Sequence, residues 1–285
     1  MEINSTMVKD LREKTGVGMM DCKKALQESA GDMEKAIEWL RKKGISKSAK
    51  RADRAASKGV FGVYFAPDHK HFTAVELNCE TDFVAKNEDF VKMANDLAAH
   101  VAAHGTTDEA ALRAEKFAAD ASKTVGDLLA EAVAKIGEAI RFGKIVDWKA
   151  AGGENFLGLY VHTGAAAIGL TELTGATGAD AVELGKNLGM QIVASKPAYL
   201  APADVPAAVL EKEKEIYREE AKAAGKPEKI LDKIAEGKLA KFYQDNCLLN
   251  QIYVKDTDGS MTVETLVKKA GVSVLRFARL MVGQS

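Results

Sequence analysis

A pattern of strand, turn, strand and helix occurs twice in this chain. In the first copy, two runs of apolar and β-branched residues, 60–65 and 72–78, flank a polar turn at 67–70, which is typical of a β-hairpin. A helix follows, in which apolar residues recur at helical spacing from Phe90 to Val101. This unit predicts a small sheet that buries one face under a helix.

The second copy has the same order of elements. Strands are predicted at residues 156–162 and 167–173, and a helix from about residue 179 to residue 194. The two helices also contain similar sequences, NDLAAHV at 95–101 and KNLGMQIV at 186–193. The repeat predicts an α+β fold built from two related hairpin-plus-helix halves.

The segments around the repeat suggest the domain boundaries. We assign residues 59–140 to the N-terminal half, and residues 141–204 together with 246–285 to the C-terminal half. Ala-rich helices within residues 107–138 and a strand near residues 145–148 are placed at the join between the halves.

Residues 205–245 are predicted to form an inserted helical hairpin. A polar helix rich in Glu and Lys is broken by the sequence GKP at 225–227, and a second helix with one apolar side resumes at 228–244. Two antiparallel helices of this kind form a coiled-coil hairpin. Because its apolar surface is too small to fold it flat onto a globule, we expect it to protrude. The chain then returns to core material, with a helix at 263–270 and a last strand at 272–282.

Residues 1–45 predict a separate three-helix head. Helices are expected at residues 6–14 and 19–30, and a third helix begins after Asp32, whose side chain can serve as an N-cap. Each helix has one apolar side, so the three sides can enclose a small core. The residues assigned to that core are Met7, Val8, Leu11, Met20, Ala25, Leu26, Met33, Ile37 and Leu40.

Residues 46–58 are predicted to form a basic linker between the head and the N-terminal half. The wider segment from Arg41 to Lys58 holds eight basic residues and one acidic residue, Asp53, with little apolar periodicity. A solvated, partly helical connector explains this composition, because charge runs usually form solvated surfaces. The alternative is an arm that binds RNA or the ribosome, and such binding would depend steeply on salt.

The composition excludes several classes of protein. Of the 285 residues, 47% are hydrophobic and 28% are charged, which is too apolar for a chain that is disordered throughout. The 40 Lys and Arg residues balance 41 Asp and Glu residues, so a nucleic-acid partner is not favoured. No segment approaches the roughly twenty apolar residues of a membrane span, and the first residues do not resemble a signal peptide.

The cysteines agree with a reducing compartment. Cys22, Cys79 and Cys247 form an odd set without CxxC spacing, which favours neither a disulfide framework nor a thiolate zinc site. We therefore expect a cytoplasmic protein that has no membrane partner.

No arrangement of residues predicts catalysis or a resident cofactor. The sequence has no GxSxG nucleophile motif and no GxxxxGK[ST] phosphate loop, so neither an enzyme nor direct nucleotide binding is supported. His100 and His104 are four residues apart on a predicted helix, a spacing that can hold a metal, but no third ligand follows in the sequence. We therefore predict a binding protein without a metal or a cofactor.

The segment Thr81, Asp82, Phe83 and Val84 lies where a predicted strand ends and a helix begins. Thr81 or Asp82 can cap that helix, and an N-cap followed by a buried Phe is common, which would make the segment purely structural. Phe83 precedes Phe90 by seven residues. Periodicity alone therefore does not decide whether Phe83 belongs to the core.

Two long sequence blocks resemble the bacterial elongation factor Ts family, the guanine-nucleotide exchange factors of elongation factor Tu. The blocks are LREKTGVGMMDCKKAL at residues 11–26 and ELNCETDFVAKN at residues 76–87. Shorter matches occur in the family's order: KIGE at 135–138, YVH at 160–162, ASKP at 194–197 and LLNQ at 248–251. The matches run through nearly the whole chain.

The resemblance implies a fold and an activity. In the family, the head is a ubiquitin-associated-like module that docks on the GTPase domain of elongation factor Tu, and the two core halves carry a protruding coiled-coil hairpin. Asp82 and Phe83 are implied to enter that domain beside its Mg²⁺ site, so that residues 81–84 dislodge Mg²⁺ and release GDP, after which GTP can bind. Mg²⁺ demands near-ideal octahedral geometry, so a small displacement of its ligands weakens both the ion and the nucleotide.

The resemblance also implies two secondary contacts with elongation factor Tu, through His162 and Lys23. A strand-end His and a solvated helix Lys explain these residues equally well. The chain departs from the family's Gly-Gly-Arg-like turn after His162, where it has TGAAA at 163–167, and from an Arg-Arg-like pair, where it has RFGK at 141–144. The sequence leaves a homodimer open as an alternative state.

Overall fold

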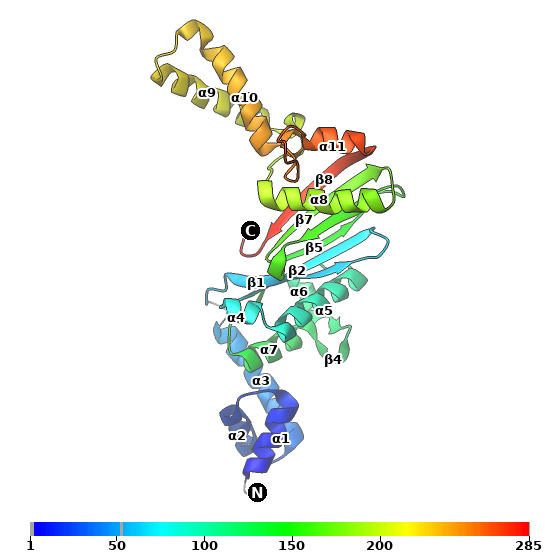
Figure 1. The fold of residues 1–285 in the computed structure, drawn as a ribbon. Coiled ribbons are helices and arrows are strands. Elements are labelled where there is room, and N and C mark those ends of the chain that lie inside the picture. Colours follow the sequence, from blue (N-terminus) through cyan, green and yellow to red (C-terminus); the bar gives the residue numbers. More distant parts are fainter. Residues whose placement is uncertain (1–2, 52–53, 285) are drawn as a thin grey trace.

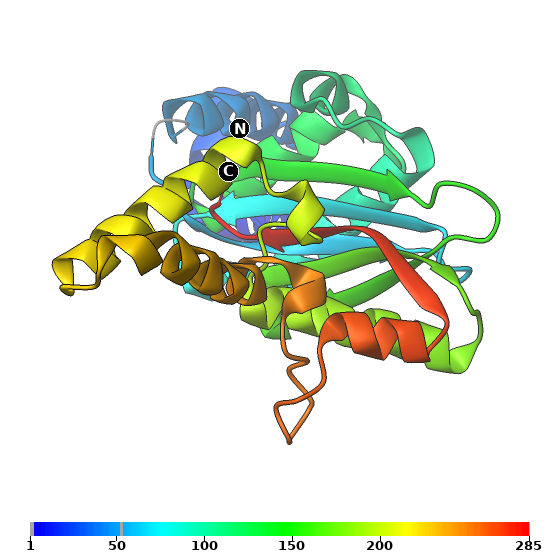
Figure 2. The same ribbon diagram turned by 90° about the horizontal axis from the view of Figure 1, so that it is seen from above.

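The structure is a computed structural model that describes residues 3–51 and 54–284, without the side chains of residues 45–51 (Figure 1). The molecule is elongated: a helical head, a central core of sheets and helices, and a helical hairpin lie in a row. Seen from above, the hairpin also projects sideways from the core (Figure 2). This arrangement confirms the predicted α+β fold class.

Three helices form the head, as the sequence predicts. Their bounds are α1 (Ser5–Thr15), α2 (Met19–Glu28) and α3 (Met33–Arg51). Asn4 caps α1 by accepting the backbone N–H of Met7 at 2.9 Å, and Gly16 ends it with φ 65°, a left-handed conformation that glycine adopts without strain. The head has its own buried core: Val8, Leu11, Val17, Cys22, Ala25, Leu26, Ala36 and Leu40.

Two residues assigned to the head core from the sequence are on the surface instead. Met20 is 76% exposed and Ile37 is 39% exposed. Met20 lies in the first turn of α2, whose inward side is formed by Cys22 and Leu26. The helical period locates α2 correctly, but it does not identify which residues of the first turn face the core.

The first half of the core is a three-stranded antiparallel sheet covered by helices. Its elements are β1 (Lys58–Phe65), β2 (His71–Cys79), α5 (Glu88–His104), α6 (Glu109–Ala114), β3 (Lys116–Phe117), β4 (Asp120–Thr124), α7 (Val125–Ile136) and β5 (Arg141–Lys149). The strand order is β1–β2–β5. The small β3–β4 hairpin was not predicted, because the Ala-rich composition of this region indicates helix throughout.

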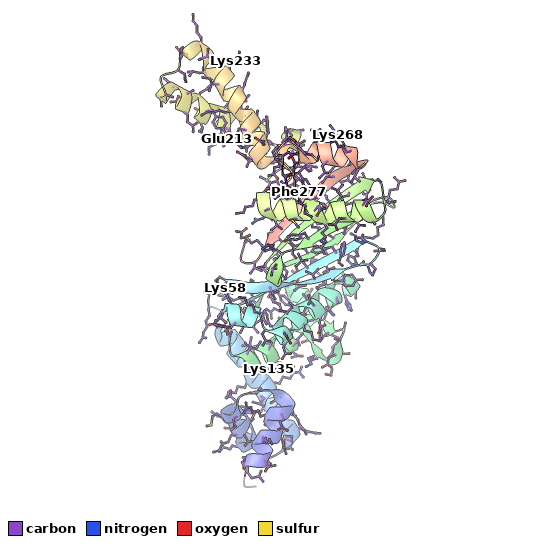
Figure 3. The ribbon with its side chains drawn as sticks, in the orientation of Figure 1. Lys58, Lys135, Glu213, Lys233, Lys268 and Phe277 are labelled. Carbon is purple, nitrogen blue, oxygen red and sulfur yellow. The ribbon has the colours of Figure 1, made fainter. Side chains whose placement is uncertain are left out.

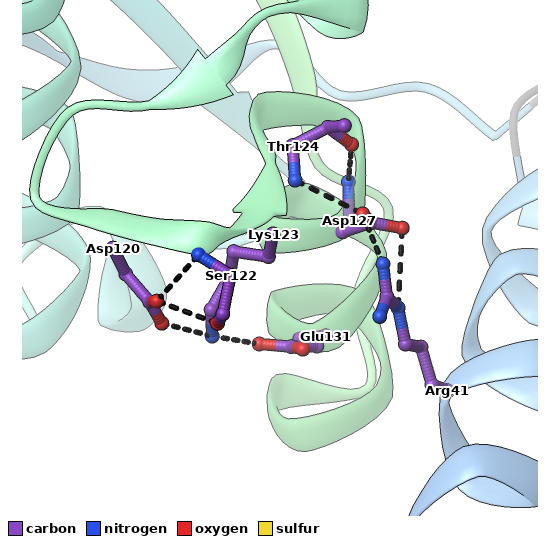
Figure 4. A network of polar contacts seen from close by, with 7 residues as sticks. All are labelled: Arg41, Asp120, Ser122, Lys123, Thr124, Asp127 and Glu131. Carbon is purple, nitrogen blue, oxygen red and sulfur yellow. Dashed lines mark hydrogen bonds and ion pairs between the residues drawn. The ribbon is translucent and has the colours of Figure 1, made fainter.

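The helix α3 attaches the head to this half. It continues through residues 46–51, so the first part of the segment expected as a linker is helical, and residues 52–53 lie outside the described ranges. An added Cβ on Gly44 would lie 3.1 Å from a backbone oxygen of α7, which shows how closely the two helices pack. Arg41 forms an ion pair with Asp127, the third residue of α7 (Figure 4).

The second half repeats the plan of the first. Its elements are β6 (Phe156–Val161), β7 (Ala167–Gly175), α8 (Ala179–Ser195), α11 (Val263–Lys269) and β8 (Val272–Met281). The strand order is β6–β7–β8, all antiparallel, and α8 covers this sheet as α5 covers the first (Figure 1). The predicted duplication of a hairpin plus a helix is confirmed.

The pairing of β5 corrects the predicted domain division. The sequence division puts residues 141–149 in the C-terminal half, but β5 pairs with β2 from His71 opposite Lys149 to Asn78 opposite Arg141. The second sheet takes its third strand, β8, from the end of the chain. Local periodicity indicates that a strand exists, but its pairing partner is set by contacts between segments far apart in the sequence.

The two sheets pack face to face, so the core has helix, sheet, sheet and helix layers (Figure 1). Phe61 and Phe72 of the first sheet share a buried cluster with Leu157 and Ile168 of the second. The covering helices approach the sheets at glycines, since a Cβ on Gly62 would lie 1.9 Å from a backbone oxygen of α5. The sequence therefore needs glycine where strand and helix backbones nearly touch.

The predicted hairpin consists of α9 (Ala207–Ala223) and α10 (Leu231–Asn246), and it protrudes from the core as expected (Figures 1 and 2). Ion pairs join its helices, Arg218 with Asp232 and Lys238 with Glu220. Within the described ranges, we find no helix with the length and apolar character that crossing a membrane requires.

Candidate functional site

A separate four-residue helix, α4 (Asp82–Ala85), lies between β2 and α5. Thr81 caps it, with its hydroxyl oxygen accepting the backbone N–H of Val84 at 3.4 Å. Asn87 caps α5 independently, with its side chain accepting the backbone N–H of Phe90 at 3.2 Å. Phe83 and Phe90 therefore lie on different helices and do not share one helical face.

The two phenylalanines have opposite environments. Phe90 is 1% exposed in the core of the first half, whereas Phe83 is 90% exposed. The interpretation of Phe83 as a buried residue behind an N-cap is therefore wrong for this chain. Val84 packs against the same core, so α4 is anchored on one side while Phe83 extends from the other.

Asp82 is also at the surface. Its side chain is 65% exposed, and its carboxylate lies 3.6 Å from the ammonium group of Lys58 at the start of β1. An ion pair this long and this exposed to solvent contributes little to stability. Lys58 and Lys135 flank this side of the molecule between the first sheet and the head (Figure 3).

Cys79, two residues before the segment 81–84, is chemically inert. Cys79 is fully buried at the end of β2, and its Sγ donates to the carbonyl oxygen of Thr81 at 3.2 Å. Burial and, to a smaller extent, the nearby carboxylate of Glu138 raise the pKa of the Cys79 thiol to about 11. The thiol is therefore protonated at neutral pH and holds the backbone rather than reacting.

An open groove of about 690 Å³ lies beside Phe83. Its walls come from the head at Thr15, from α5 and from α7, and they combine apolar side chains with charged ones at the rim. Across it, the ammonium group of Lys135 lies 3.1 Å from the carboxylate of Asp89. The exposed ring and this groove form one surface of mixed apolar and charged character, which is typical of sites that bind another protein.

The two secondary candidates lie on other parts of the molecule. Lys23 is exposed on α2 of the head, and His162 is exposed just after β6 in the second half, where its Nδ1 lies 3.0 Å from the Tyr160 hydroxyl. The structure thus does not gather Lys23, His162 and residues 81–84 into one pocket. It distributes them over the head and both halves of the core.

The exposed methionines next to Lys23 were missed by the sequence reasoning. Met19 and Met20 are 55% and 76% exposed, and flexible methionines at a surface adapt well to a partner. The helical spacing assigned Met20 to the head core, so the sequence held no signal that would have identified these exposed side chains.

The histidine pair has a third neighbour in space that the sequence spacing did not indicate. Nε2 of His100 lies 2.8 Å from the Glu115 carboxylate, and His104 stacks on His100. The backbone N–H of Ala118 donates to Nδ1 of His100 at 3.1 Å, so the ring carries its proton on Nε2 and donates it to Glu115. Because both nitrogens of His100 are used, the cluster suits a hydrogen-bond network and not a metal.

The described basic side chains of the segment 41–58, which exclude those of residues 45–51, have acidic neighbours within the molecule. Every basic side chain between residues 41 and 58 that the structure describes lies within ion-pair distance of a carboxylate: Arg41, Lys42, Lys43, Arg54 and Lys58. Figure 4 shows the pair of Arg41 with Asp127. The Asp127 side chain also completes the capping box of α7 by accepting the backbone N–H of the N-cap residue Thr124 at 3.0 Å.

Known proteins resemble this chain over nearly its whole length. The profile of the family described as "Elongation factor TS" matches residues 80–284, and the profile "Elongation factor Ts, mitochondrial, N-terminal" matches residues 1–47. The protein named elongation factor Ts from Nitratidesulfovibrio vulgaris (strain DP4) is 43% identical over 295 residues, which cover 100% of this chain and 97% of the relative. That from Clostridium botulinum (strain ATCC 19397 / Type A) is 44% identical over 262 residues, 91% of this chain and 84% of the relative.

Proposed function

The chain belongs to the elongation factor Ts family, which implies nucleotide exchange on elongation factor Tu, and we propose that it acts by inserting Asp82 and Phe83 beside the Mg²⁺ site of that GTPase. The insertion dislodges Mg²⁺ and releases GDP, so that GTP can bind. In this role the chain makes no covalent bond and needs no cofactor, and we place its activity in the cytoplasm.

The observation that carries this proposal is the exposure of Phe83. An aromatic ring that is 90% exposed contributes almost nothing to the stability of its own chain, yet it extends from a helix that is anchored by Val84 and capped by Thr81. Such a ring gains free energy when a partner buries it. Asp82, beside Phe83, brings a negative charge toward the diphosphate of GDP, and the two negative groups repel each other.

The energies show that Phe83 does not act alone. Burying one Phe ring yields about 1.5–3 kcal/mol, whereas moving a two-state equilibrium from mostly closed to mostly open takes on the order of 5.5 kcal/mol. The remaining binding energy comes from other contacts with the partner. These contacts are made by the exposed methionines and Lys23 of the head, by the groove beside Phe83 and by His162 in the second half. Linkage then requires GDP to weaken the binding of this chain as much as the chain weakens the binding of GDP.

The direct test is the release of fluorescent GDP from elongation factor Tu in a stopped-flow instrument, with and without this chain. Acceleration by the chain supports the proposed function. The double variant Asp82→Ala/Phe83→Ala keeps the fold, since both side chains are exposed, and it is expected to slow the release. A double variant that releases GDP as fast as the unchanged chain would exclude insertion as the mechanism.

A further inference from the structure

We propose that Glu138 is a positioning residue that holds Asp82 and Phe83 in the orientation needed for exchange. The inference rests on the proposed function, because it concerns the same segment. Glu138 lies just after α7, where Gly137 with φ 87° turns the chain away from the helix and toward the end of β2.

The contacts of Glu138 are with the base of the 81–84 segment. One carboxylate oxygen, Oε2, accepts the backbone N–H groups of Glu80 and Thr81, both at 3.0 Å. The other oxygen, Oε1, accepts the Thr81 hydroxyl at 2.7 Å. In return, Oε1 of Glu80 accepts the backbone N–H of Ala139 at 2.7 Å. The residues just before α4 are thus joined to the residues just after α7 by reciprocal hydrogen bonds, several of them to charged groups, which are the stronger kind.

Thr81 transmits this constraint to α4. The Thr81 hydroxyl donates its proton to Glu138, and the same hydroxyl oxygen accepts the backbone N–H of Val84. The bond to Glu138 therefore fixes the rotation of the hydroxyl and orients the oxygen lone pair that caps α4. Phe83 itself is 90% exposed, and the ion pair of Asp82 is long and solvated. The direction in which both side chains point is therefore determined mainly by the backbone that Glu138 holds.

Loss of this hold is expected to affect exchange more than stability. A displacement of about 1 Å in a positioned group can cost up to a hundredfold in rate. For a ring on a short helix that keeps its Val84 anchor, we expect Glu138→Ala to slow catalysed GDP release by about tenfold. In Glu138→Gln the amide oxygen can still accept both backbone N–H groups, while its NH₂ group donates to Thr81, so this variant should retain most of the rate.

The test is a mutant cycle that combines Glu138→Ala with the double variant Asp82→Ala/Phe83→Ala, read out as GDP release by stopped flow together with thermal unfolding of the free chain. If Glu138 acts through Asp82 and Phe83, the Glu138→Ala change has no further effect in the background that lacks both side chains. A merely structural role would slow exchange equally in both backgrounds and would overturn the inference.

Glu115→Ala is the matched control, because this carboxylate in the same half also accepts a hydroxyl, that of Thr106, and a ring N–H, that of His100. It should lower the melting temperature and leave exchange unchanged, and a tenfold loss in this control would contradict the inference. If Glu138→Ala does not fold, Thr81→Val removes the shared hydroxyl and should slow exchange only when Asp82 and Phe83 are present. Normal exchange by Phe83→Ala alone would remove the proposed function, whereas slow Phe83→Ala with normal Glu138→Ala would remove only the role of Glu138.

Discussion

Replacing Phe83 by Ala should separate stability from exchange. Because the side chain is 90% exposed, only about a tenth of the roughly 1.5–3 kcal/mol that full burial of a Phe gives is present in the free chain, or about 0.2–0.3 kcal/mol. The melting temperature should therefore change by about 1 °C or less. If the partner buries the whole ring in the state that releases GDP, losing it costs about 1.5–3 kcal/mol, or about 10- to 150-fold in catalysed rate.

Phe90→Leu is the natural comparison, because Phe90 is the same residue type seven positions later and is 1% exposed. Replacing a buried Phe by the smaller Leu leaves a cavity and costs about 1–3 kcal/mol, which should lower the melting temperature by several degrees without altering GDP release. Circular-dichroism melts and stopped-flow GDP release on both variants give the two readouts. The reasoning is refuted if Phe83→Ala destabilises the free chain as much as Phe90→Leu, or if it releases GDP at the unchanged rate.

Three further predictions concern the core that carries the segment. Glu172→Gln should lower stability by about 1–2 kcal/mol in thermal melts, because Glu172 is 1% exposed and the change weakens its charged hydrogen bonds, among them the 2.6 Å pair with the half-exposed Arg276. Burial raises the pKa of Glu172, but hydrogen bonds from a backbone N–H and from Arg276 outweigh this effect and hold the pKa below its ordinary value. The stability that ionised Glu172 contributes is therefore present above its unfolded-state pKa and is lost as the pH falls through its folded-state pKa. Acid titration should accordingly destabilise the unchanged chain more steeply than the Gln variant. Gly62→Ala should cost about 1–3 kcal/mol in urea unfolding, because its Cβ would lie 1.9 Å from the carbonyl oxygen of Ala94; an unchanged midpoint would contradict the close packing of β1 on α5. Cys79, with its pKa raised to about 11 by burial, should react with a thiol reagent at pH 8 only as fast as the chain opens, and rapid labelling under native conditions would show that the thiol is accessible.

Local sequence pattern accounts for most of the fold. The two hairpins, the helices that cover them, the head and the protruding hairpin all follow from runs of apolar residues at a spacing of two or 3.6 and from the turns between them. The family resemblance, carried by the blocks at residues 11–26 and 76–87, is confirmed by relatives that are 43–44% identical over nearly the whole chain.

The remaining features depend on contacts that are distant in the sequence. The β3–β4 hairpin has a composition typical of helix, and it exists because Phe117 is buried in the core of the first half. Likewise, the residues of β5 do not by themselves indicate that this strand pairs with β2, which lies far away in the sequence.

Residues 81–84 were proposed as a site through the family resemblance alone, and their geometry does not follow from it. The exposure of Phe83 depends on the break between α4 and α5, which two adjacent caps at Thr81 and Asn87 produce. The role of Glu138 depends on a contact between the end of β2 and the end of α7, because Glu138 and Thr81 are 57 residues apart in the sequence. Neither feature can be obtained from periodicity, because both arise where separate elements come together.

The most direct test of the account is a crystal structure of this chain bound to nucleotide-free elongation factor Tu. We expect the ring of Phe83 to be buried in the GTPase domain within van der Waals contact of residues beside the vacated Mg²⁺ site, with Asp82 adjacent and Glu138 still hydrogen-bonded to Thr81. A complex in which that ring stays in solvent, or packs elsewhere than beside the Mg²⁺ site, would contradict the central claim.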